Sequence, residues 1–118
     1  MLDPRPAHKE LSGKIRVAKS AIAQGKIVLV EPLSIICDAA ELGYETQYLP
    51  IILGELLDIA TPEHYVGTRP PQKSYEKMIS GKDLIAFKVV YERLKSIIYL
   101  KYTVVDGVFY LVSLHEDR

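Results

Sequence analysis

The end of the chain carries a proton-transfer group, a cation and two hydroxyls at spacings that a β-hairpin can bring together. They are Tyr99, Lys101, Ser113 and His115. Side chains alternate between the two faces of a strand, so residues two apart share a face. Histidine titrates near neutral pH and suits acid–base roles, and lysine suits the stabilisation of negative charge. The polar face of a solvated sheet explains the same residues equally well.

The turn between the two strands decides which side chains share this face. A two-residue loop, Asp106-Gly107, mixes polar and apolar side chains on both faces. A three-residue loop that begins at Val105, with Gly107 in the left-handed position of a G1 bulge, separates them. We therefore predict the three-residue loop, with Tyr99 opposite Ser113 and diagonal to His115. In this register the core face holds even-numbered residues 98–104 and 110–114, and the opposite face holds odd-numbered residues 99–103 and 109–115.

Strand and helix patterns upstream indicate how the hairpin is supported. Residues 84–91, 97–105 and 108–115 are rich in β-branched and aromatic side chains, which is typical of strands. Helical spacing of apolar residues recurs over 8–24, in a segment from Ser34 to Gly43 and in one from Thr46 to 60, and a short strand is expected at 26–30. Because helices come first and an antiparallel meander last, we predict an α+β fold with N-terminal helices packed on a small antiparallel β-sheet.

The middle of the chain, residues 61–83, is rich in Pro and Gly and has no apolar run. This pattern predicts a long loop with one short strand near residues 75–79. Loops of this length inside a compact domain often carry function.

Composition limits the class of protein. The 118 residues suit one domain, residues 1–118, and 48% apolar with 25% charged residues is typical of a globular chain. No apolar run approaches the ~20 residues that span a bilayer, and the polar start does not resemble a signal peptide, so we expect a cytoplasmic protein without a membrane partner. Three histidines and one cysteine match no zinc pattern, and no metal or other cofactor is expected. Cys37 lies in an apolar run and is expected to be buried.

Charge is unevenly distributed along a chain whose formal net charge is zero. Residues 65–101 hold eight basic and three acidic side chains. A local positive excess favours a nucleic-acid partner, whereas charge alone is explained more simply by a solvated face.

Six short blocks carry a family resemblance. They read His-Lys-Glu-Leu at 8–11, Ala-Gln-Gly-Lys-Ile at 23–27, Ala-Ala-Glu-Leu-Gly at 39–43, Ile-Ile-Leu-Gly at 51–54, Tyr-Leu-Lys-Tyr-Thr-Val at 99–104 and Leu-Val-Ser-Leu-His-Glu at 111–116. Their order and spacing, over nearly the whole chain, resemble those of motility quorum-sensing regulator (MqsR) toxins in the RelE/ParE-like superfamily. The resemblance implies a RelE-like toxin fold, metal-independent cleavage of messenger RNA and a cognate antitoxin protein that holds the toxin inactive. A homodimer and a toxin–antitoxin hetero-oligomer both remain open.

Residue by residue, Tyr99 and Lys101 match the family pattern directly. A family glutamine falls on Lys88, and a family lysine near the end of the chain falls on His115. In a Phe-Tyr-Lys-Ser-Met-like strand of the family only Tyr65 matches, and a second family lysine falls on Val66, so that cation is absent here. The loop at 68–83 is longer than in the family.

Metal-free RNA cleavage needs a base for the ribose 2′-hydroxyl, cations for the transition-state charge and an acid for the departing 5′-oxygen. In our interpretation His115 is the general acid or base, and Lys101, with Lys88 or Arg69, binds the scissile phosphate. Tyr99 orients the phosphate or stacks on a base. Further RNA-binding candidates are Arg69, Lys73, Tyr65, Tyr75 and Ser113.

Two other functions remain compatible with these residues. One is a RelE/ParE-fold toxin that blocks a protein target without cleaving RNA. The other is a regulatory module that has lost activity, since the family lysine is missing at Val66.

Overall fold

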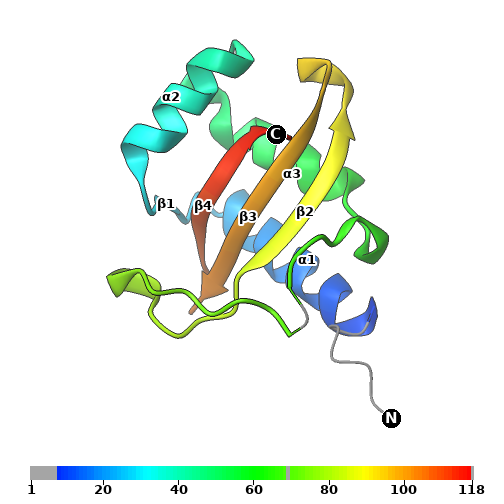
Figure 1. Cartoon of the computed structure of the whole chain (residues 1–118), viewed down its shortest axis with the longest axis vertical. Helices are drawn as coiled ribbons and strands as arrows, with labels where there is room; N and C mark the ends of the chain where they lie inside the picture. The colour runs from blue at the N-terminus through cyan, green and yellow to red at the C-terminus, as the bar shows by residue number, and fades with distance from the viewer. Residues whose placement is uncertain (1–7, 69, 118) are drawn as a thin grey trace.

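Helices pack on one face of a small sheet (Figure 1). The structure, a computed structural model, describes residues 8–68 and 70–117. Within these residues the helices are α1 (His8–Ala23), α2 (Pro32–Leu42) and α3 (Leu49–Ile59), and the strands are β1 (Ile27–Leu29), β2 (Ile85–Tyr91), β3 (Ser96–Val105) and β4 (Val108–Glu116). The predicted α+β class is confirmed.

The sheet has the strand order β1-β4-β3-β2. Strands β2, β3 and β4 form the antiparallel meander expected from the sequence. The short strand expected near 26–30 joins its far edge in parallel, with Ile27 beside Phe109, so the sheet is mixed. Figure 1 shows α1 and α3 behind the sheet and α2 beside β1 and β4.

The helix boundaries shift from the predicted ones for local reasons. Pro32, which suits a first helical turn, opens α2 ahead of Ser34. A 3-10 turn, Thr46–Tyr48, precedes α3. Helix α2 buries Ile35 and Ala39, which leaves Cys37 exposed, so the expected burial of this thiol is wrong.

The main core lies between the helices and the sheet. The α1 stripe at Leu11, Ile15, Ala18 and Ile22 is buried, as the spacing predicts. The Tyr102 ring stacks between the rings of Phe87 and Phe109, at centroid distances of 6.3 and 4.8 Å. Burial raises the pKa of the Tyr102 hydroxyl, because the interior disfavours the phenolate. Rings packed in this way hold β2, β3 and β4 in one register.

The hairpin turn differs from the prediction. Asp106 and Gly107 form a two-residue turn with φ angles of 52° and 75°, and Val105 pairs with Val108. The predicted three-residue loop is wrong because an Asp-Gly pair fits the two left-handed positions of a type I′ turn.

A β-bulge restores the expected face further along the hairpin. Tyr102 pairs with Leu111, but Lys101 pairs with Ser113, which leaves Val112 as the extra residue. One extra residue moves every later side chain of its strand to the other face.

The bulge divides β4 into two parts whose side chains agree differently with the predicted faces. Beyond the bulge, His115 shares a face with Tyr99 as predicted and lies directly opposite that tyrosine instead of diagonal to it. Between turn and bulge the predicted faces are reversed. Phe109 and Leu111 lie in the main core, and Tyr110 and Val112 lie outside it.

The loop between α3 and β2 covers part of the sheet face that the helices leave open. Residues 75–79 form no strand, because the backbone here bonds within the loop, from the Ser74 N–H to the Lys82 carbonyl at 2.9 Å. A 3-10 turn, Lys77–Ile79, instead carries Ile79 into a second small core with Val30 and Leu84. Val105, Tyr110 and Val112 pack against this second core. The face opposite the helices is therefore covered near the hairpin turn and open at its other end.

No helix within residues 8–68 and 70–117 is long and apolar enough to cross a membrane.

Candidate functional site

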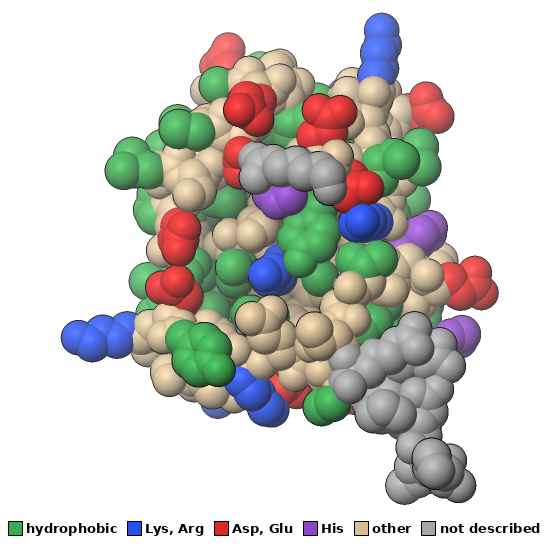
Figure 2. All heavy atoms as spheres, in the orientation of Figure 1, with side chains coloured by type: hydrophobic (Ala, Val, Ile, Leu, Met, Phe, Trp, Pro, Cys, Tyr) green, Lys and Arg blue, Asp and Glu red, His purple; other side chains and the backbone are tan. Residues whose placement is uncertain are grey.

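The open part of the sheet carries predicted site residues in two neighbouring rows across β2, β3 and β4. In the first row Lys88 pairs with Tyr99, and Tyr99 pairs with His115. In the second row Ala86 pairs with Lys101, and Lys101 pairs with Ser113. Figure 2 looks onto this side of the molecule, where basic, histidine and hydrophobic side chains lie side by side. We call the surface formed by Lys88, Tyr99, Lys101, Ser113 and His115 the site face.

Tyr99 and His115 form the centre of the site face. Their rings stack with centroids 5.1 Å apart and planes 16° apart. The His115 Nδ1 lies 2.7 Å from the backbone carbonyl oxygen of Glu116. A carbonyl can only accept, so Nδ1 carries the hydrogen, and in the neutral ring the lone pair belongs to Nε2. The stack and this hydrogen bond together fix the ring and its tautomer, which prepares Nε2 to accept a proton.

Lys101 supplies a cation beside this pair. Its Nζ lies 5.9 Å from the centre of the Tyr99 ring, near the outer limit of a cation–π contact. The ion pairs among the described residues do not include Lys101. Its cross-strand neighbour Ser113 adds a hydroxyl in the same row. A cation with no competing carboxylate can bind an incoming anion.

Lys88 reaches a partner that the sequence did not suggest. Its Nζ lies 2.9 Å from Oδ1 of Asp117, which follows the end of β4. The backbone N–H of Asp117 donates to the Ile97 carbonyl at 2.8 Å, which ties the chain end to β3. The only signal in the sequence was the acidic pair that follows His115.

Val66 extends the second row beyond the edge of β2. Tyr65 bridges to Phe87, and the Val66 N–H donates to the Ala86 carbonyl at 2.9 Å. Because side chains alternate, Tyr65 lies on the core side with Phe87, and Val66 lies on the side of Ala86 and Lys101. The position on which the missing family lysine falls is therefore adjacent to the site face.

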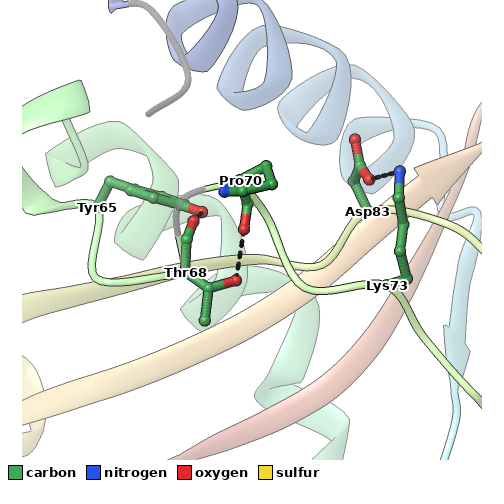
Figure 3. Close-up of polar contacts among 5 residues, drawn as sticks. All are labelled: Tyr65, Thr68, Pro70, Lys73 and Asp83. Carbon is green, nitrogen blue, oxygen red and sulfur yellow. Dashed lines mark hydrogen bonds and ion pairs between the residues drawn. The ribbon is translucent and has the colours of Figure 1, made fainter. Parts of the chain in front are cut away.

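The loop candidates are more scattered. Lys73 forms an ion pair with Asp83 across an isolated β-bridge (Figure 3). Tyr75 is 93% exposed, and none of the described aromatic pairs includes its ring. Arg69 lies outside the described residues.

Tyr65 is used for packing and for the start of the loop. Its ring meets that of Phe87 edge-on at 6.1 Å. Its hydroxyl donates to the Thr68 carbonyl at 2.7 Å, and the Thr68 hydroxyl donates to the Pro70 carbonyl at 2.7 Å (Figure 3). A side chain added at Gly67 would come within 2.4 Å of the Tyr65 hydroxyl, so a larger residue there would have to displace the Tyr65 ring. Tyr65 lies apart from the site face.

A second polar cluster fixes the connection between β2 and β3. Arg93 holds both carboxylate oxygens of Glu55 on α3, through Nε and Nη2, each at 2.7 Å. The Tyr91 hydroxyl donates to the same carboxylate. The hydrogen bond from Arg93 lowers the pKa of Glu55 to about 2, and burial raises the pKa of Tyr91 to about 12. Sequence reasoning missed this cluster because Tyr91 and Arg93 lie 36 and 38 residues after Glu55.

No group of three or more His, Cys, Asp or Glu side chains in the described part of the chain is placed to hold a metal ion. No protein-family model matches the chain, and no curated protein matches it.

Proposed function

We propose that this chain is a metal-independent endoribonuclease of the MqsR type, the toxin of a type II toxin–antitoxin system acting in the cytoplasm. The observation that carries the proposal is the Tyr99–His115 stack with its imidazole tautomer fixed by the Glu116 carbonyl. Lys101 lies beside the stack, and Lys88 adjoins it in the same row. Five positions that correspond to family residues (66, 88, 99, 101 and 115) come from four separate segments of the chain and adjoin one another on one face, which supports the resemblance. Tyr65, which also matches the family, lies on the core side.

The chemistry follows from these groups. Nε2 of His115 takes the proton of a ribose 2′-hydroxyl, and the 2′-oxygen forms a bond to phosphorus. The bond from phosphorus to the 5′-oxygen breaks, and the leaving oxygen takes a proton from the Lys101 ammonium or from solvent. Lys101 and Lys88 stabilise the charge that builds up on the phosphoryl oxygens. The products are a 2′,3′-cyclic phosphate and a 5′-hydroxyl.

The proposal is tested by inducing the chain alone in a bacterial host and mapping new 5′ ends of cellular RNA. Growth arrest with new 5′-hydroxyl ends is the expected result, and a His115→Phe chain should produce neither. Growth arrest without new ends would favour a toxin that blocks a protein target. Normal growth of cells that contain folded wild-type chain would contradict the toxin proposal. A short adjoining gene for an antitoxin, whose product relieves the arrest, completes the expected pattern.

A further inference from the structure

A third row of the open sheet face lies next to Lys88 and Tyr99. It consists of Val90 and Ile97, which pair across β2 and β3. Val90 follows Lys88 by two positions and Ile97 precedes Tyr99 by two, so both share the site face's side of the sheet and lie about 7 Å from it along the strands. We call this pair the apolar shelf.

The apolar shelf is exposed to solvent, whereas the other end of the same sheet face is covered. Val90 is 61% exposed and Ile97 is 46% exposed. Near the hairpin turn, by contrast, Tyr110 and Val112 are packed under the second core. Two adjacent β-branched side chains on a strand pair make a flat apolar surface on which a planar ring can lie.

A cavity of about 510 Å³ opens against this shelf. Its lining includes Val90 and Ile97 together with three acidic residues, Glu92, Glu116 and Asp117, and one basic residue, Lys95. This volume is typical of sites that hold small organic molecules. Asp117 also contacts Lys88, so the cavity is continuous with the site face.

We propose that the apolar shelf binds the nucleobase next to the scissile phosphate and that the carboxylate rim selects a base with an exocyclic amino group. The inference rests on the proposed ribonuclease function. With the phosphate at Lys101 and Lys88, the neighbouring nucleotide spans the distance of one row and lays its base over Val90 and Ile97. Carboxylates only accept hydrogen bonds, and adenine, cytosine and guanine carry an amino donor that uracil lacks. Ion pairs among the described residues leave Glu92 and Glu116 free to accept it.

The test uses oligodeoxynucleotides with one internal ribonucleotide, so that only one phosphate can be cleaved. The base on one side of that phosphate, and then on the other, is cytosine, uracil or absent. On the side of the phosphate whose base lies on the apolar shelf, loss of that base should lower kcat/KM about 5- to 100-fold, the range expected for one stacked base. On that side cytosine should exceed uracil at least about fivefold.

Variants test whether the apolar shelf and the carboxylate rim cause these two base preferences. The double variant Val90→Thr, Ile97→Thr keeps β-branched side chains in the strands and should cleave normal and abasic substrates at similar rates. Glu116→Gln should reduce the preference for cytosine over uracil, since an amide can also donate. Ile51→Gln, a change at a 56% exposed apolar residue on α3, should alter neither preference.

The outcomes separate the two proposals. Cleavage by the wild-type chain that ignores the neighbouring base on both sides would overturn the shelf and leave the ribonuclease intact. Base dependence that survives in the double variant would also overturn it. Equal rates with cytosine and uracil would overturn the role of the carboxylate rim. Absence of cleavage by the folded wild-type chain on every substrate would contradict the proposed function itself.

Discussion

Asp117 holds the ammonium of Lys88 through an ion pair of 2.9 Å, at the end of the row in which Lys88, Tyr99 and His115 are neighbours. A phosphate that binds Lys88 has to displace this carboxylate. Replacing Asp117 by Asn should therefore strengthen RNA binding about two- to fivefold, in line with the small free energy of a partly exposed ion pair. Fluorescence anisotropy with a non-cleavable 2′-deoxy analogue measures the change.

The control for this prediction is Asp58→Asn. Asp58 forms a 2.6 Å ion pair with Lys19 among the helices, so the substitution changes the net charge by the same amount. If both variants tighten RNA binding equally, net charge causes the effect, and the prediction that Asp117 competes with phosphate for Lys88 is wrong.

Val66→Lys should restore the missing family cation. Val66 adjoins the row of Ala86 and Lys101 and is 44% exposed, so the new ammonium can reach a phosphate without disturbing the core. One further phosphate contact should raise the affinity for a single-stranded analogue and steepen its dependence on log salt concentration by about 0.7. Val17→Lys on α1, with the same 44% exposure, is the matched control. An unchanged salt slope in Val66→Lys would place this position outside the phosphate path.

Deletion of Val112 should lower the free energy of unfolding far more than the substitution Val112→Ala. Without the bulge, residues 113–116 move to the opposite face or slip in register, and Leu114, which is fully buried, loses its place in the core. Loss of a buried leucine alone costs about 2–5 kcal/mol, which can unfold a domain of this size. Val112→Ala retains the bulge and should cost about 1 kcal/mol or less. Denaturant unfolding measures both, and a deletion variant as stable as Val112→Ala would contradict the role of the bulge.

The Glu55 cluster gives the protein a defined response to acid. Arg93 lowers the pKa of Glu55 from its ordinary 4.5 to about 2. The folded state therefore gains stability from the ionised carboxylate above pH 4.5 and loses it as the pH falls toward 2. Thermal unfolding of Glu55→Gln should show a lower Tm than the wild type at pH 7, and the difference should shrink between pH 4.5 and 2. A constant difference over that range would show that the carboxylate charge is not the cause.

The sequence predicted the three helices, strands β1 to β4 and the shared face of Tyr99, Lys101, Ser113 and His115 because these depend on local patterns, whereas the strand expected at 75–79 is absent. Alternation of side chains identified both strands of the hairpin, and Gly43, with φ 84°, ends α2 as expected. The face of His115 was correct, although the extra residue comes from a bulge at Val112 and not from the turn. A three-residue turn and a two-residue turn followed by a bulge both place His115 on the same face. The pattern of polar residues therefore could not distinguish the two.

The remaining features depend on contacts between distant parts of the chain. The Arg93–Glu55 pair joins α3 to the β2–β3 connection, and Ile79 packs with Val30, just after β1, and with Leu84, just before β2. No periodicity in the sequence encodes such contacts. Asp117 became part of the site only because β4 ends beside Ile97 and returns the chain end to Lys88.

The central claim is that His115 transfers the proton beside Tyr99 and Lys101, and the cleavage rate of His115→Phe on a single-ribonucleotide substrate tests it most directly. Phenylalanine keeps a ring for the stack on Tyr99 but cannot exchange a proton, so the variant should fold and bind the non-cleavable analogue as the wild type does. The account predicts a fall in kcat of about 10²- to 10⁴-fold. A variant that cleaves at the wild-type rate would contradict it.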